Sequence, residues 1–146
     1  MTKETKVQSI INYLDEIQEI IHNKHHDTAI KYNLTVEEFH IMLHLNMKNT
    51  PPTVSELAQS FNNAQNTMSE KLTRLEEKSF IERKRDPKDK RISRIILSEQ
   101  GKSIVASICY ESENKFISDR ISKIDDKQLN TLIDGLENLI IQLKEN

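Results

Sequence analysis

Apolar residues near the start of the chain recur at the alternating three-residue and four-residue spacing of a helix. The pattern predicts one long amphipathic helix. Its apolar positions are Val7, Ile10, Ile11, Leu14, Ile17, Ile20 and Ile21. A second apolar stripe, close to the other end, has a period of nearly seven and consists of Leu129, Leu132, Ile133, Leu136, Ile140 and Leu143. Because a lone terminal helix cannot bury such a stripe, we expect the two ends of the chain to pack together.

Two capping signals open helices in the middle of the chain. Thr35 is followed three residues later by Glu38, and Thr53 by Glu56, which is the pattern of a capping box. The first of these helices is apolar on nearly all sides, so we expect it to be central. Its apolar residues are Phe39, Ile41, Met42, Leu43 and Leu45. The second helix follows a double proline and carries Val54, Leu57, Ala58 and Phe61 at helical spacing.

A tight turn and a further helix follow. Asn62 and Asn63 tolerate the left-handed backbone conformation that such a turn needs. The next helix is predicted from about Ala64 to Lys78, with an inward stripe of Met68, Leu72 and Leu75. Its outward face carries Gln65, Asn66, Thr67, Ser69, Lys71 and Arg74. These amide, hydroxyl and cationic groups suit base edges in a DNA major groove, although such a face, taken alone, is more often simply solvated.

A charged hairpin comes next. Phe80-Ile81 and residues 92–97 are predicted strands, joined by a loop over residues 82–91 whose turn is marked by Asp86-Pro87 and Asp89. Residues 83–94 hold seven cations and two acids, a net charge of +5, whereas the whole chain has a net charge of −2. A local positive projection on an acidic protein favours contact with a phosphate backbone. The candidate contacts at the hairpin are Arg85, Lys88, Lys90 and Arg91.

Two more helices complete the pattern. Ser98 is a predicted N-cap of a helix that runs to about Ser122, and Asp125 with Gln128 caps the last helix. The elements together predict a mainly α fold with a small β-hairpin, an α+β class in the broad sense.

The middle of the sequence resembles the MarR family of winged helix-turn-helix transcriptional regulators. The resemblance lies in TVSELA, then T-M-S-x-K-L-T-R-L-E-E-K, then F-I-E-R-K-R-D-P-K-D-K-R, and finally I-x-L-S-E-x-G. Four features depart from the family pattern. Asn62-Asn63 replaces a glycine and an apolar residue, Ala64 replaces a capping serine, Ser79 replaces a glycine, and Glu70 places an acid in the recognition helix.

The resemblance implies the organisation and the function. It implies one domain over residues 1–146, with a winged helix-turn-helix at 35–97 and dimerisation helices at 5–31 and 98–144. It further implies a homodimeric repressor that binds a pseudo-palindromic operator in double-stranded DNA and responds to a small molecule between the dimerisation helices and the winged part. The alternative from another class is a winged-helix module that binds protein through its hairpin cations.

Composition and the motifs that are missing argue against a membrane protein, a disulfide-bonded protein and an enzyme. No apolar run approaches the 18–20 residues of a membrane span, and the N-terminus lacks a secretory signal, so a cytoplasmic protein without a membrane partner is expected. The single cysteine, Cys109, excludes an internal disulfide. No nucleophile elbow, phosphate-binding loop, dinucleotide fingerprint or zinc-protease motif is present, so neither an enzyme nor a cofactor is predicted.

Five histidines raise the question of a metal. His22 and His26, and likewise His40 and His44, stand one helical turn apart, a spacing at which two imidazoles can share an ion. A metal-responsive repressor is therefore a further alternative, but a sensor site needs three or four ligands. Solvated or pocket-lining histidines are the favoured interpretation, and Cys109 in mid-helix is interpreted as a packed thiol rather than a redox sensor.

Overall fold

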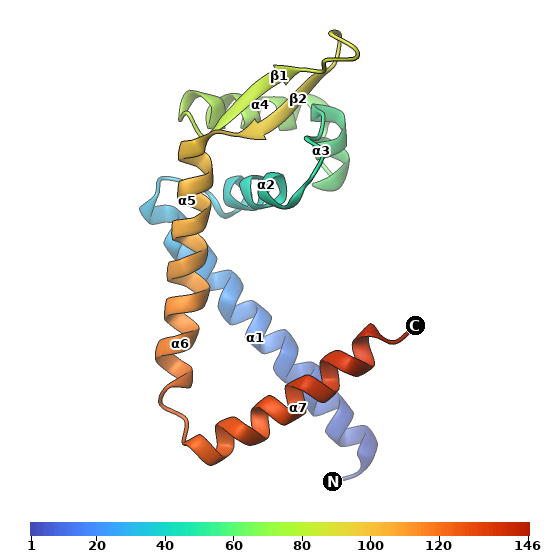
Figure 1. Ribbon diagram of the computed structural model, residues 1–146, viewed down its shortest axis with the longest axis vertical. Helices are drawn as coiled ribbons and strands as arrows, with labels where there is room; N and C mark the ends of the chain where they lie inside the picture. Colours follow the sequence, from blue (N-terminus) through green and yellow to red (C-terminus); the bar gives the residue numbers. More distant parts are fainter.

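The computed structural model describes all residues, 1–146, and has a winged part at one end and long helices at the other (Figure 1). The elements in chain order are α1 (Lys3–Lys31), α2 (Val36–Met47), α3 (Val54–Ser60), α4 (Gln65–Glu77), β1 (Ile81–Arg85), β2 (Ser93–Leu97), α5 (Glu99–Cys109), a π-helix (Tyr110–Lys115), α6 (Phe116–Ile121) and α7 (Asp126–Lys144). The predicted mainly α fold with a β-hairpin is confirmed.

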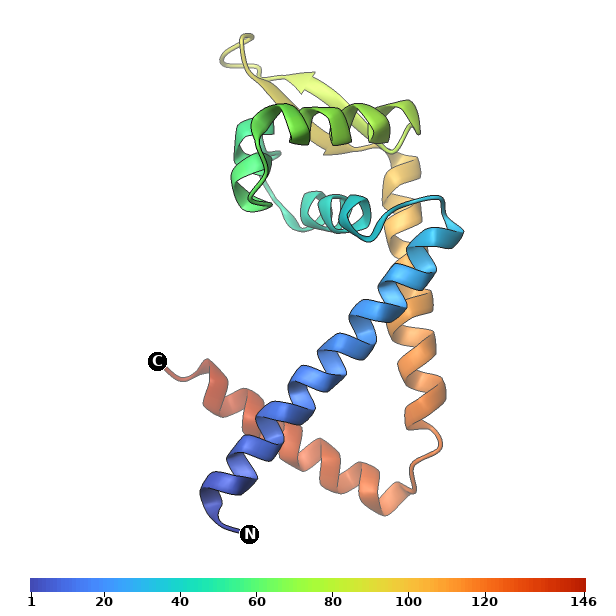
Figure 2. The same cartoon turned by 180° about the vertical axis from the view of Figure 1, so that it is seen from behind.

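The hydrophobic core lies in the winged part and in the adjoining ends of α1 and α5. It contains 17 buried residues, all of them between Ala29 and Ile108. Helix α2 supplies Phe39, Ile41, Met42 and Leu45 to this core, and Figure 2 shows it with α4 and the hairpin above it, α3 on one side and α5 on the other. The prediction that the apolar helix after Thr35 is central is therefore confirmed.

The predicted caps form, one of them only in part. Thr35 and Glu38 make both hydrogen bonds of a capping box at the start of α2. At α3 the Thr53 hydroxyl accepts from the Glu56 N–H at 3.1 Å, but the reciprocal bond is absent. Thr53 instead forms an isolated β-bridge with Arg94, which ties the start of α3 to the hairpin.

The hairpin strands differ from their predicted extent. β1 was predicted only at Phe80-Ile81, yet it runs to Arg85 and pairs antiparallel with β2, with Ile81 opposite Leu97 and Arg85 opposite Ser93. Cross-strand hydrogen bonds hold the charged residues 82–85 in extended conformation, although their side chains carry no strand signal. Ile81, Ile95 and Leu97 point inward and join the core.

Three residues other than glycine adopt a positive φ. They are Asn33 at 60°, Asn62 at 52° and Ser79 at 66°. Asn62 makes the tight turn between α3 and α4, as its sequence predicts, whereas Asn63 does not share this conformation. Ser79 lies directly after α4 and its carbonyl accepts from the Ser98 hydroxyl at 2.6 Å. The backbone at Ser79 therefore needs the conformation that a glycine adopts at least cost.

Replacing Ser79 by glycine is expected to stabilise the protein by about 0.5–1 kcal/mol. A residue with a Cβ in the left-handed conformation costs about 1–2 kcal/mol, which glycine avoids. Glycine also makes the unfolded chain more flexible, and this offsets part of the gain in stability. The bond to Ser98 uses the backbone and survives the change. Urea denaturation measures the effect, with Ser79→Ala as the control that keeps the Cβ. A Ser79→Gly protein no more stable than Ser79→Ala would contradict the explanation.

The predicted helix from residue 99 to about 122 is present but not regular. Its middle is the π-helix Tyr110–Lys115, which the apolar pattern does not reveal. Two side chains of this segment reach α1 and the residue that follows it. Glu113 Oε1 lies 2.8 Å from His25 Nε2, and Glu111 Oε1 accepts from the Tyr32 hydroxyl at 2.8 Å. The π-helix is therefore the place where α5 and α6 are joined to α1 by polar contacts.

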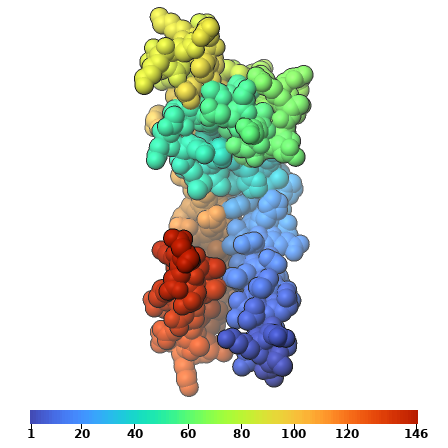
Figure 3. Space-filling model, turned by 90° about the vertical axis from the view of Figure 1, so that its right-hand side faces the viewer, coloured from blue at the N-terminus to red at the C-terminus, as the bar shows by residue number.

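Helix α7 and the first half of α1 stand away from the core. No residue of α7 is buried, and no residue of α1 before His25 is buried. Figure 3 shows α7 in red and the start of α1 in blue below the winged part. A groove of about 730 Å³ separates them and is lined mainly by apolar residues, among them Ile10, Leu14, Ile17, Leu132 and Leu136.

Candidate nucleic-acid interface

The outer face of α4 forms a shallow depression of about 870 Å³, and six of the seven residues that line it are polar or charged. Its lining consists of Val54, Gln65, Asn66, Ser69, Glu70, Thr73 and Arg74. The inward stripe of Met68, Leu72 and Leu75 is buried, so the helix has the orientation that the sequence predicts. Thr73 and Glu70 belong to this face although they were not among the predicted contacts. Their positions, four residues after Ser69 and Asn66, would have indicated the same face.

Lys71 does not belong to this outer face, which corrects the sequence-based assignment. Its ammonium lies 2.6 Å from Glu37 Oε1 on α2 and donates to Asn63 Oδ1 at 2.7 Å. Position 71 is one helical turn from the buried Met68 and Leu75 and next to the buried Leu72, so its side chain emerges at the edge of the inward stripe. In the structure the Lys71 ammonium is therefore held by Glu37 and Asn63 and does not lie on the outer face.

The start of α4 has no side-chain cap. Ala64 is the N-cap, and the backbone N–H groups of Gln65, Asn66 and Thr67 have no acceptor within the protein. Thr67 is exposed beside this end of the helix. Free N–H groups and the positive end of the helix dipole make such a terminus suited to a phosphate oxygen.

Two aspartates shape the tip of the hairpin, which we call the wing (residues 86–92). Asp86 Oδ1 accepts from the backbone N–H groups of Lys88 at 2.7 Å and Asp89 at 3.2 Å, while Asp86 Oδ2 accepts from Arg94 Nε at 2.6 Å. The Arg94 guanidinium, and after it the Lys88 N–H, lowers the pKa of Asp86. Arg94 also donates to the Pro51 carbonyl at 2.8 Å, so the wing is fixed to the segment before α3.

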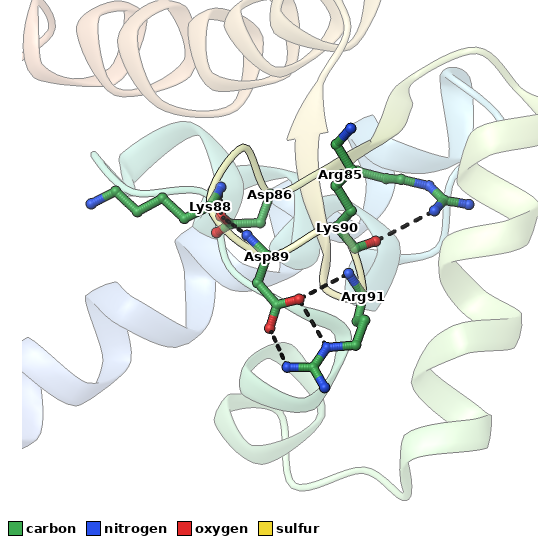
Figure 4. A network of polar contacts seen from close by, with 6 residues as sticks. All are labelled: Arg85, Asp86, Lys88, Asp89, Lys90 and Arg91. Carbon is green, nitrogen blue, oxygen red and sulfur yellow. Dashed lines mark hydrogen bonds and ion pairs between the residues drawn. The ribbon is translucent and has the colours of Figure 1, made fainter.

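The second aspartate holds Arg91 at the surface. Asp89 Oδ1 accepts from Arg91 Nε at 3.0 Å and Asp89 Oδ2 from Arg91 Nη2 at 3.1 Å, a bidentate pair visible in Figure 4. The side chain of Arg91 is nevertheless 90% exposed. Hydrogen bonds from Arg91 lower the pKa of Asp89, and the same pair raises the pKa of Arg91. Both groups therefore stay charged at neutral pH.

The remaining cations of the hairpin differ in whether their side chains are bonded within the chain or exposed to solvent. Arg83 lies across α4 and donates to the Ser69 carbonyl and the Thr73 hydroxyl, so it fixes the hairpin to the helix. Arg85 is exposed and makes one long bond, 3.4 Å, to the Lys90 carbonyl. Lys88 and Lys90 are exposed and their ammonium groups have no partner within the chain; Figure 4 shows Lys88 extending away from the turn. Arg85, Lys88, Lys90 and Arg91 thus all reach solvent.

Three of the five histidines, His22, His25 and His40, lie together where α1 meets α2. The rings of His22 and His40 are 5.4 Å apart and those of His25 and His40 are 6.2 Å apart. His44 lies against Phe61 instead, at 5.5 Å, and His26 is exposed. Burial, followed by the charge of His22, lowers the pKa of His40, and burial also lowers the pKa of His44. No three histidine, cysteine or acidic side chains are placed to share an ion.

Cys109 has the environment of a packed thiol. It is half-buried at the end of α5, and burial raises its pKa, with a smaller contribution from the nearby charge of Glu113. A reactive cysteine needs the opposite shift, because the thiolate is the nucleophile.

The sequence and the fold both match known proteins. The sequence model of the MarR family matches residues 34–93. An uncharacterized HTH-type transcriptional regulator of Bacillus cereus is 32% identical over 106 residues, which cover 70% of this chain and 69% of the relative. A regulator of the same description from Bacillus anthracis matches with the same identity and coverage.

Several solved structures share the fold. The transcriptional regulator Tm0710 from Thermotoga maritima has a TM-score of 0.86 at 21% identity and covers 94% of this chain and 95% of its own. The multiple antibiotic-resistance repressor MarR from Listeria monocytogenes has a TM-score of 0.86 at 14% identity, with full coverage of both chains. The S. aureus MepR–DNA complex has a TM-score of 0.70 at 21% identity and covers 91% of this chain and 99% of its own.

None of the helices is both long and apolar enough to cross a bilayer. The match in sequence over two thirds of a regulator, together with the winged helix-turn-helix seen in the structure, determines the family. The chain therefore belongs to the MarR family of DNA-binding, winged helix-turn-helix transcriptional regulators rather than to a class of enzymes.

Proposed function

We propose that this regulator is a repressor that binds a pseudo-palindromic operator as a homodimer. In each subunit α4 lies in a major groove and the wing enters the neighbouring minor groove. The observation that carries the proposal is the pairing of two surfaces at the end of the molecule away from α7. These are the uncapped, polar outer face of α4 and the exposed wing cations (Figure 1).

The chemistry of the two surfaces supports separate tasks. Gln65, Asn66 and Arg74 present amide and guanidinium groups that match base edges, and the free N–H groups at the start of α4 suit a phosphate. Lys88, Lys90 and Arg91 form a narrow positive tip that suits the minor groove. S. aureus MepR, which has a similar fold, has been seen in complex with DNA, and this supports DNA binding by the present chain.

The exposed apolar surfaces support the homodimer. In this proposal residues 35–97 form the DNA-binding part, and residues 5–31 and 98–144 form the dimerisation part. Ile10 is 49% exposed, Ile17 52%, Ile133 51% and Ile140 49%. Apolar side chains that recur along two helices and stay this exposed indicate a surface that another chain covers. A two-fold axis would then place the two copies of α4 in successive major grooves.

A pocket next to the π-helix supports control by a small molecule. Its volume is about 520 Å³, and its lining includes Lys24, Lys31, Tyr32, Tyr110, Lys115, Phe116 and Arg120. The pocket lies between the end of α1 and the α5–α6 segment, where these dimerisation helices approach the winged part. A ligand that prefers one angle between these helices would favour one spacing of the two recognition helices, and so alter operator affinity.

The wing provides the first test, because phosphate contacts give affinity and salt dependence whereas base contacts give discrimination. Replacing Lys90 by alanine removes one unpaired cation from each wing. We expect weaker binding to every duplex and a fall of roughly one to two units in the slope of log Kobs against log salt. Binding isotherms at several salt concentrations measure this. Lys6→Ala, at the far end of α1, is the matched control and should leave the slope unchanged.

A substitution on α4 completes the comparison. Asn66→Ala should keep the salt slope and lower the preference for the operator over scrambled DNA by about 1–3 kcal/mol. If Lys90→Ala binds DNA with the slope of the wild type, the wing does not touch DNA. A winged-helix module that binds acidic protein surfaces would then be the better interpretation of the wing cations.

A further inference from the structure

Lys71 on α4 and Lys78, the residue that directly follows the helix, are held by two adjacent glutamates on α2. Lys71 and Lys78 are seven residues apart, close to two helical turns, and so lie on the same side of the helix. Lys71 Nζ is 2.6 Å from Glu37 Oε1, and Lys78 Nζ is 3.3 Å from Glu38 Oε2. Glu37 and Glu38 stand in the first turn of α2, directly after the Thr35 cap. The two ion pairs therefore join α4 to the start of α2 at two points.

Each lysine also bonds to a second partner on a different part of the chain. Lys71 donates to the side chain of Asn63 in the turn before α4, at 2.7 Å. Lys78 donates to the backbone carbonyl of Asn33 in the turn after α1, also at 2.7 Å. Both lysine side chains are mostly covered, with 19% of Lys71 and 27% of Lys78 exposed. These are not isolated surface pairs, whose contribution would be small.

The two ion pairs restrict small movements of α4 that apolar packing alone allows. The buried stripe of Met68, Leu72 and Leu75 determines which face of α4 turns inward. Apolar contacts have no preferred direction, however, so they resist a small tilt or slide of the helix only weakly. Hydrogen-bonded charges at the middle of the helix (Lys71) and at its C-terminal end (Lys78) resist these movements, because such bonds weaken quickly when the groups are displaced. Recognition of base edges depends on placement to within about 0.5 Å.

We propose that Lys71 and Lys78, with Glu37 and Glu38, are positioning residues that set the angle at which α4 meets the DNA. This inference rests on the proposed contact of α4 with base edges. It adds the residues on the inner side of α4 that hold the helix in position. Lys71 acts through Glu37 and does not contact DNA. Lys78 links the C-terminal end of α4 directly to Asn33, so a movement of α1 is transmitted to the recognition helix.

The test compares Lys71→Met with Glu37→Gln, which break the same pair from opposite sides. The probes are the duplex that wild-type protein selects from random sequences and a scrambled duplex of equal composition. We expect both variants to lower the preference for the selected duplex by about tenfold, the size of one lost base contact, with an unchanged salt slope. A double variant should be no worse than either single one, because the pair is already broken.

A direct phosphate contact by Lys71 predicts a different result. Lys71→Met would then weaken binding to both duplexes and reduce the salt slope, while Glu37→Gln, which removes a negative charge, would leave binding equal or stronger. That pattern, or an unchanged preference in both variants, would overturn the proposal. Wild-type protein that selects no duplex at all would instead overturn the proposed function, which separates the two failures.

Two further variants protect the test from loss of folding. Circular dichroism melts show whether each protein is folded at the temperature of the assay. Lys78→Met breaks the second pair independently and should reproduce the loss of preference. Exchanging the charges, Glu37→Lys with Lys71→Glu, should recover most of the preference, whereas a Lys71 that contacts phosphate would leave the exchanged protein a weaker binder with a reduced salt slope.

Discussion

Placing a charge in the apolar stripe of α7 is expected to abolish both dimerisation and operator binding. Leu136→Asp places a carboxylate in the groove between α1 and α7, where Leu136 is now 43% exposed. If a second subunit covers this surface, the charge must be buried without a partner, which costs several kcal/mol. Light scattering at micromolar concentration should then show a dimer for the wild type and a monomer for the variant. Gel shifts should show loss of the specific complex in parallel.

Asn138→Asp serves as the control for that experiment. Asn138 is exposed on α7 and lies two residues from Leu136, about 200° around the helix. The same charge on that side should leave the dimer intact. Removal of residues 129–146 should have the same effect as Leu136→Asp. A wild-type monomer at micromolar concentration would show that the exposed stripes serve another purpose.

Replacing Gly101 by alanine should destabilise the protein by about 1–3 kcal/mol, the usual cost of forcing an extra carbon into a packed site. A Cβ at this position would lie 2.1 Å from the Phe80 carbonyl oxygen and 3.2 Å from a methyl carbon of Leu97. The Phe80 carbonyl cannot move freely, because it accepts from the Ser98 N–H at 3.0 Å where the hairpin joins α5. This close approach explains the glycine in the L-S-E-x-G motif.

Urea denaturation measures the effect of Gly101→Ala. Ser103→Ala is the matched control, since Ser103 is exposed on the same helix and gains the same residue. Its stability should stay within about 0.5 kcal/mol of the wild type. A Gly101→Ala protein with an unchanged urea midpoint would show that the junction between the hairpin and α5 can move to accept the extra carbon without loss of stability.

Local signals were enough to predict most of the fold. The Thr35 capping box, the Ser98 and Asp125 N-caps and the turn at Asn62 all form where the sequence places them. Helix α4 was predicted at 64–78 and is observed from Gln65 to Glu77. These features depend on residues within a few positions of each other, so their physical basis is visible in the sequence.

Features that depend on distant residues were not predictable in the same way. The extension of β1 to Arg85 follows from pairing with β2, and Lys71 faces inward because Glu37, 34 residues earlier, receives it. Polar helix faces look alike in a sequence until a neighbouring element covers part of them. For this reason the candidate contacts on α4 could be predicted as a face, but Lys71 could not be separated from Arg74 without the structure.

The π-helix at Tyr110–Lys115 makes the direction of the C-terminal helices sensitive to the loss or gain of a single residue. A π-helical turn accommodates one more residue than an α-helical turn. Loss of one residue there would let α5 and α6 form a regular helix, rotating everything beyond it by about 100° and drawing it back by about 1.5 Å. The direction in which α7 leaves the winged part would then change without any substitution in α7. A single codon deletion or insertion at this site could therefore reorient the two halves of the protein in one evolutionary step.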